Sequence, residues 1–223
     1  MDGLRLGSDF VRYSSPPIVI GVDFGKQRDP TAIVVTEAIK VDRPGLRPEW
    51  RFEVRSMERV ALNTDYLAVG RRIAEVVRNI EARPVALNQY PPSIQLVLDS
   101  SGVGVPGVDI VRDALYGSRA RLTAVTFSHG EALNCKSSRA WTVGKGFLLK
   151  RLQALLQMER IKLPANHPEA AAMARELQDY EIKIDSDGDM KTGAFRVGSH
   201  DDLATALALA VLRDPGGFGL STA

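Results

Sequence analysis

Cysteine is nearly absent from this sequence, since Cys135 is the only one in 223 residues. A single thiol cannot form a disulfide within the chain, and it argues against a zinc site built on thiolates. Proline and glycine, at 12 and 19 residues, are too few for a collagen-like or low-complexity chain. The composition therefore favours a globular protein in a reducing, intracellular setting.

Long apolar runs and a large excess of one charge are also missing. The longest strongly apolar stretch, 203–212, is far shorter than the roughly 20 residues of a membrane span, so we interpret it as a buried helix. The first 17 residues lack the apolar segment of a signal peptide. The formal net charge of +2 is too small to indicate a nucleic-acid binder by itself. We expect no membrane partner, and any claim of DNA binding must come from local sites.

The pattern of apolar residues predicts one α/β domain over residues 18–214, between an N-terminal tail or linker, 1–17, and a C-terminal tail, 215–223. Three strands come first, followed by alternating helices and strands and then a closing helix. We expect Thr64 to cap the first helix and Asp201 to open the last. The expected strands are 18–23, 31–36, 50–55, 93–99, 121–127 and 161–163, with a hairpin at 181–184 and 190–197, and the expected helices are 64–80, 106–116, 141–158, 168–178 and 201–212.

Acidic residues stand at the ends of these elements, where side chains leave the core together. Asp23 and Asp99 each close an apolar strand, and Asp201 and Asp202 begin the last helix. Taken singly, Asp99 could be a turn residue and Asp201 or Asp202 a helix cap. Taken together, converging carboxylates would repel one another and lose hydration unless a cation compensates. The sequence therefore predicts a metal site, with Asp23 on a strand beside and parallel to the strand that carries Asp99.

Four segments, taken together, resemble the C-terminal nuclease domain of the large terminase subunit of tailed double-stranded DNA phages. They are the GVDFG segment at 21–25 with the following 29–35, the turn at 98–104, the stretch 155–164 with 174–177, and the SHDD segment that opens 199–210. The resemblance covers residues 18 to about 213. It implies an RNase H-like fold, with a central mixed β-sheet and helices on both faces.

The resemblance also implies an activity. The chain would be a metal-dependent endonuclease that cuts concatemeric viral double-stranded DNA during genome packaging, in the cytoplasm of the infected bacterial host. Asp23, Asp99 and Asp201 or Asp202 would hold two Mg²⁺ or Mn²⁺ ions. Adjacent helix residues point about 100° apart, so only one of Asp201 and Asp202 is expected to bind a shared ion directly, and we favour Asp201 slightly. The implied partners are DNA, a packaging ATPase, the portal and the small terminase subunit.

Basic residues and one histidine complete the expected site. Lys136, Arg139, Lys145 and Lys150 cluster in sequence around the start of a predicted helix and could grip DNA phosphates, although a solvated helix face explains them as well. His200, beside Asp201, could orient a ligand. The chain has no GxxxxGK[ST] phosphate loop, so we expect a nuclease domain that cannot translocate DNA alone.

Three other functions fit parts of the pattern. The GVDFG segment also resembles the first phosphate loop of actin-like ATPases and sugar kinases, but that fold needs a second lobe, and the motif occurs here once. A Holliday-junction resolvase of the same superfamily would carry similar carboxylates. A catalytically silent DNA-binding or docking module is the non-enzymatic alternative, and the intact acidic positions argue against it.

Overall fold

The computed structural model describes residues 13–25, 29–42, 45, 48–86, 89–101, 104–184, 190–194 and 201–215. His200, the hairpin turn 185–189, and most of the two predicted tails lie outside these ranges. Within the described ranges, no helix is long and apolar enough to cross a membrane.

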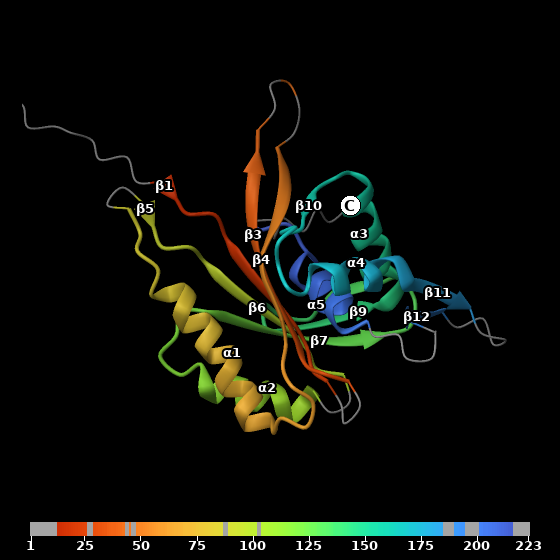
Figure 1. The fold of residues 1–223 in the computed structure, drawn as a ribbon, viewed down its shortest axis with the longest axis horizontal. Coiled ribbons are helices and arrows are strands. Elements are labelled where there is room, and N and C mark those ends of the chain that lie inside the picture. Colours follow the sequence, from red (N-terminus) through yellow and green to blue (C-terminus); the bar gives the residue numbers. More distant parts are fainter. Residues whose placement is uncertain are drawn as a thin grey trace, which may run out of the picture.

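A twisted mixed sheet forms the centre of the molecule (Figure 1). Among the described residues, eight strands follow the order β10-β4-β3-β2-β6-β7-β9-β8. Strands β4, β3 and β2 form the predicted antiparallel meander, and β2, β6, β7 and β9 run parallel. At the two edges, β10 pairs parallel with β4 and β8 antiparallel with β9. The predicted parallel pairing of the strands that carry Asp23 and Asp99 is confirmed. The sheet strands are β2 (Ile18–Asp23), β3 (Ala32–Val41), β4 (Glu49–Arg59), β6 (Ile94–Asp99), β7 (Arg121–Ser128), β8 (Leu133–Cys135), β9 (Ala140–Gly144) and β10 (Ile161–Lys162).

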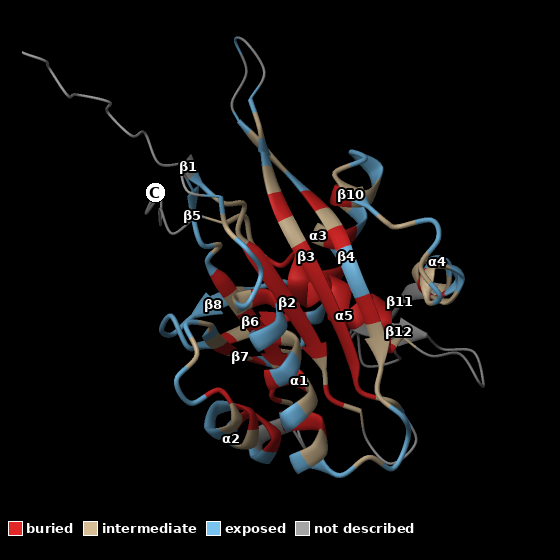
Figure 2. Ribbon diagram, turned by 60° about the vertical axis from the view of Figure 1, so that its left-hand side comes forward, coloured by how far each residue is buried: buried red, intermediate tan, exposed pale blue. Residues whose placement is uncertain are grey.

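Helices cover both faces of this sheet, as predicted. Successive strand residues point to opposite faces. Ile20 on β2 packs with α1 (Tyr66–Glu81) and α2 (Gly104–Ala114), whereas Val19 joins the core under α3 (Lys145–Gln157), α4 (Ala170–Asp179) and α5 (Asp202–Ala210). Figure 2 shows the buried residues concentrated on β2, β3 and α5. The molecule therefore has three layers, with two separate hydrophobic cores.

Helix α5 lies against β2 with almost no side chain between them. A Cβ atom built on Gly21 would stand 1.9 Å from the carbonyl oxygen of Ala206 and 2.6 Å from the backbone nitrogen of Ala210. All nine residues of α5 are buried. The glycine in β2 and the alanines of α5 thus allow the helix backbone to touch the strand.

Some sequence predictions were wrong in detail. The predicted helix 141–158 begins only at Lys145, because Ala140–Gly144 pairs with β7 as a strand, and β8 was missed entirely. Helix α1 is capped by Asp65, whose Oδ1 accepts a hydrogen bond from the backbone nitrogen of Ala68 at 2.8 Å, and not by Thr64. Two short pairings complete the structure: β1 (Tyr13–Ser14) with β5 (Gln89–Tyr90), and the predicted hairpin of β11 (Tyr180–Ile184) with β12 (Met190–Ala194).

Candidate active site

A pocket of about 410 Å³ opens where β2 and β6 end and α5 begins. The carboxyl ends of neighbouring parallel strands meet at one edge of a sheet, where ligand sites form in α/β folds. Asp23 is the last residue of β2 and Asp99 the last of β6, while Asp201 and Asp202 start α5. All four line this pocket. The structure thus brings together the four carboxylates that the sequence singled out.

The turn after β6 is fastened to β7 by short hydrogen bonds. The Asp99 Oδ1 atom accepts a hydrogen bond from the backbone nitrogen of Ser101 at 2.7 Å, and the Ser101 Oγ atom accepts one from the backbone nitrogen of Phe127 at 2.8 Å. Asp99 is therefore a turn residue, as one of the two interpretations held, and it faces the pocket as well.

Ionising the carboxyl groups of Asp23 and Asp202 costs free energy in this position. Burial raises the pKa of Asp23 well above its usual value, and the neighbouring charges of Asp99, Asp202 and Asp201 raise it further. The pKa of Asp202 is raised to about 7, mainly by burial and further by the charges of Glu176 and Asp201. A cation bound between these groups would offset the free-energy cost of burying their negative charges and would reduce their mutual repulsion.

The pocket has the donor chemistry of a Mg²⁺ or Mn²⁺ site, because carboxylate oxygens are the ligands these hard cations prefer. In the parts of the chain that the structure describes, however, no three His, Cys, Asp or Glu side chains are gathered as a ready-made metal site.

Asp201 and Asp202 differ in their surroundings. Asp202 lies in the first turn of α5 and is only 4% exposed, whereas Asp201 precedes the helix and is half-buried. Asp201 stands at the N-cap position of α5, as one of the sequence interpretations held, but its side chain makes no capping hydrogen bond to the helix. Both carboxylates line the pocket, which leaves the choice between them open.

Lys145 is the one basic side chain among the described residues that line the pocket. It is the first residue of α3, and its Nζ atom lies 5.8 Å from the centre of the Phe127 ring. Its charge lowers the pKa of Asp23, against the larger effects that raise it. The pocket therefore holds a cation that a phosphate group could contact beside the carboxylates.

The other predicted DNA contacts lie apart from Lys145. Arg139 lines a second pocket with Arg112 and Arg121 at the opposite end of β9, which is roughly 17 Å long. Lys136 is exposed in the loop before it, and Lys150 forms an ion pair with Glu131. The four residues therefore do not form one patch on the folded chain.

Two acidic residues near the site escaped the sequence analysis. Asp29 lines the pocket, and its charge raises the pKa of Asp202. Glu176 is buried on α4, where it contacts the start of α5. Both lie within the segments that carry the family resemblance, but acidic residues in a loop and on a helix give no sequence signal of where they will be placed.

No protein-family model and no curated protein sequence matches the chain significantly. Solved structures do match it. The large terminase nuclease of thermophilic phage G20c is 19% identical with a TM-score of 0.57, over 89% of this chain and 82% of that one. The nuclease domain of the large terminase subunit gp2 of bacterial virus Sf6 is 14% identical with a TM-score of 0.58, over 89% of both chains.

A Mn-soaked form of the human cytomegalovirus terminase nuclease domain is 14% identical with a TM-score of 0.54, over 92% of this chain and 90% of that one. The G20c nuclease is also known with bound cobalt and with bound magnesium. At these identities the likeness establishes the fold. The chain has the RNase H-like fold of terminase nuclease domains, as predicted.

Proposed function

We propose that this chain is a divalent-metal-dependent DNA endonuclease that cuts concatemeric viral double-stranded DNA during genome packaging. The observation that carries the proposal is the single pocket in which Asp23, Asp99, Asp201 and Asp202 meet, at the strand ends of a terminase-nuclease fold. Metal-bound forms of proteins with this fold support a divalent cofactor.

Asp23 and Asp99 would hold two Mg²⁺ or Mn²⁺ ions together with Asp201 or Asp202. The ions would activate the attacking water and stabilise the leaving 3′-oxygen of the phosphodiester. The fold of the chain sets the positions of these four carboxylates. Asp23 and Asp99 project from strands that are held side by side, and Asp201 and Asp202 from a helix packed against the first of them. Asp29, in the same pocket, adds a further negative charge that would favour cation binding.

Lys145 would contact a non-bridging oxygen of the phosphate to be cut, because it is placed beside the carboxylates. Lys136, Arg139 and Lys150 would contact phosphates farther along the duplex. Such contacts carry no base information, so we expect little sequence preference.

The wider setting follows from the same resemblance. We propose a packaging ATPase, the portal and the small terminase subunit as partners, and the cytoplasm of an infected bacterium as the place of action. His200, outside the described residues, remains a proposed neighbour of the ligands.

A plasmid-cleavage assay tests the proposal. The chain should nick and linearise duplex DNA in Mg²⁺ or Mn²⁺, and EDTA should stop it. Asp23→Asn should reduce cleavage by at least about 100-fold. Removing a residue that only orients the metal ligands costs about 10- to 100-fold, and removing a ligand itself should cost more. Asp109→Asn on the exposed side of α2, which makes the same chemical change, should cut like the wild type. Cleavage that persists in EDTA or in Asp23→Asn contradicts the proposal.

A further inference from the structure

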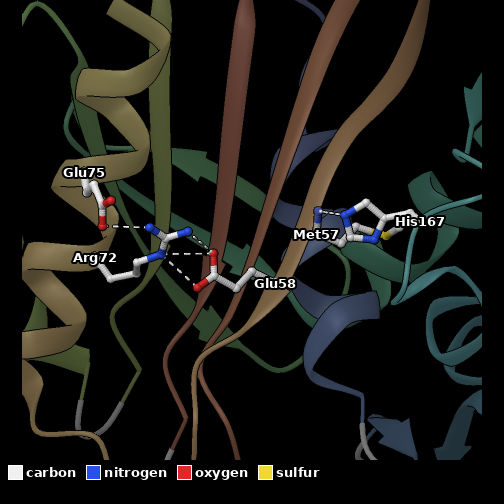
Figure 3. Close-up of polar contacts among 5 residues, drawn as sticks. All are labelled: Met57, Glu58, Arg72, Glu75 and His167. Carbon is white, nitrogen blue, oxygen red and sulfur yellow. Dashed lines mark hydrogen bonds and ion pairs between the residues drawn. The ribbon is translucent and has the colours of Figure 1, made fainter.

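The C-terminal end of β4 is attached to helices on both sides of the sheet. On one side, Glu58 accepts hydrogen bonds from Arg72 of α1 at 2.8 to 3.1 Å (Figure 3). On the other side, the backbone nitrogen of Met57 donates to Nε2 of His167, in the segment before α4, at 3.3 Å (Figure 3). Because strand residues alternate in direction, Arg59 returns to the same side as Met57.

Arg59 pairs there with two acids that come from the α4 region. Its Nη1 atom lies 2.9 Å from Oε2 of Glu169, and its Nη2 atom pairs with Oε1 of Glu176. Glu176 is only 5% exposed. A carboxylate so deeply buried requires a partner, and Arg59 supplies the charge.

The second oxygen of Glu176 reaches the start of α5. Its Oε2 atom accepts a hydrogen bond from the backbone nitrogen of Ala204 at 2.9 Å, and Leu203 donates a backbone hydrogen bond to the same carboxylate. The first backbone N–H groups of a helix have no partner within the helix and are normally satisfied by the residue before it. Here Asp201 holds the N-cap position without a side-chain hydrogen bond to α5, and the carboxylate of Glu176, from another helix, accepts from these N–H groups in its place.

We propose that Glu176, held by Arg59, is a positioning residue that fixes the N-terminal turn of α5 so that Asp201 and Asp202 face the pocket. The inference rests on the proposed function, because the two aspartates are the metal ligands assigned there. Because Glu176 caps the helix, the Asp201 carboxylate stays in the pocket. If the Asp201 side chain capped α5 itself, it would turn toward the helix backbone. Glu176 itself does not line the pocket, so it acts through the ligands.

The test measures Mn²⁺ binding by titration calorimetry, with DNA cleavage and urea unfolding of the same full-length variants. Glu176→Ala should weaken Mn²⁺ binding by about 10- to 100-fold, the usual effect of removing a group that orients metal ligands. The cleavage rate at saturating DNA should fall, the KM for DNA should stay unchanged, and excess Mn²⁺ should restore part of the rate. Glu176→Gln keeps one acceptor oxygen and should weaken Mn²⁺ binding less, by about 3- to 10-fold.

Glu58→Ala is the matched control, because it removes a glutamate–arginine pair from the same strand on the opposite face. It should lower the unfolding free energy and leave Mn²⁺ affinity unchanged. If Glu176→Ala does not fold, Glu176→Gln decides alone.

Mn²⁺ affinity within twofold of wild type in the folded Glu176 variant overturns this inference, provided that the wild type binds Mn²⁺ and cuts DNA. A wild-type chain that binds no Mn²⁺ and cuts no DNA overturns the proposed function, and the inference with it.

Discussion

The two faces of the central sheet differ in how deeply they bury charged side chains. On the α1/α2 face, the ion pair between Arg72 and Glu58 lies at the edge of the core, and both side chains are about one-third exposed, at 38% and 32%. On the α4/α5 face, Glu176 and Asp202 are buried, at 5% and 4% exposed. Burying a carboxylate costs free energy that a surface pair avoids. The comparison indicates that the first face serves stability, and that the second accepts the cost for the sake of the pocket.

Close packing differs between the faces as well. A Cβ atom built on Gly21 of β2 would meet the backbone of α5, whereas one built on Gly70 of α1 would first meet a side-chain atom, the Cγ2 of Ile110 on α2, at 2.6 Å. The Cγ2 atom of Ile110 has little rotamer freedom, because β-branched side chains are restricted in helices, but it belongs to a half-buried side chain. The backbone of α5, in contrast, cannot withdraw without moving the helix. The α5 face is therefore the more closely packed at its glycine.

Alanine at these two glycines gives the largest contrast. Gly21→Ala should lower the unfolding free energy by at least about 3 kcal/mol, because its Cβ has no room beside Ala206. Gly70→Ala should lower it by about 1 to 2 kcal/mol, because the better helix propensity of alanine offsets only part of the overpacking against Ile110. Urea unfolding of both variants measures the difference, and equal losses would show that the two faces are equally tolerant.

The pH dependence of stability isolates the buried acids. Asp202 has a pKa of about 7 in the folded chain, and the pKa of Asp23 is also raised. Between pH 4 and 7 the folded state therefore keeps protons that the unfolded state has released, so metal-free stability should fall as the pH rises through this range. Asp202→Asn should make the fall shallower, and Asp113→Asn on exposed α2 should not. Melting temperatures in EDTA at each pH provide the measurement, and parallel curves for wild type and Asp202→Asn would contradict the assignment.

The smallest effects are expected from the basic residues. Lys145→Ala should lower the cleavage rate at saturating DNA by about 10-fold, since it removes a charge at the reacting phosphate. Arg139→Ala, at the far end of β9, should raise KM by about 2- to 3-fold and reduce the salt dependence of binding. Steady-state kinetics at two salt concentrations separate the two roles. An equal loss of rate in both variants would place Arg139 at the cleavage site, against the structure.

The sequence predicted the parts of this molecule that depend on local pattern. The apolar runs that end in Asp23 and Asp99 became neighbouring parallel strands, and the alanine-rich stretch after Asp202 became a buried helix. Strong periodicity and an acidic residue at the end of each run were enough to place the carboxylates together.

Features that depend on tertiary contacts were missed. Ala140–Gly144 passes directly into α3 without a loop, so its apolar residues merged with the helical pattern, and only pairing with β7 makes it a strand. Glu176 looks like any helix-surface glutamate until Arg59, more than a hundred residues earlier, is brought beside it. The basic residues were grouped because they are close in sequence, but a single strand separates Arg139 from Lys145.

The close approach of Gly21 to Ala206 also restricts how the proposed nuclease could be switched off. Asp23 follows Gly21 by two residues, and Asp202 precedes Ala206 by one helical turn, so the two carboxylates are anchored on elements that are packed directly against each other. An inhibitor protein or a motor domain could not easily separate Asp23 from Asp202, because it would have to part α5 from β2. Control of the proposed nuclease would instead act on the turn that carries Asp99, on the contact between Glu176 and the start of α5, on the path of the DNA, or on the supply of ions.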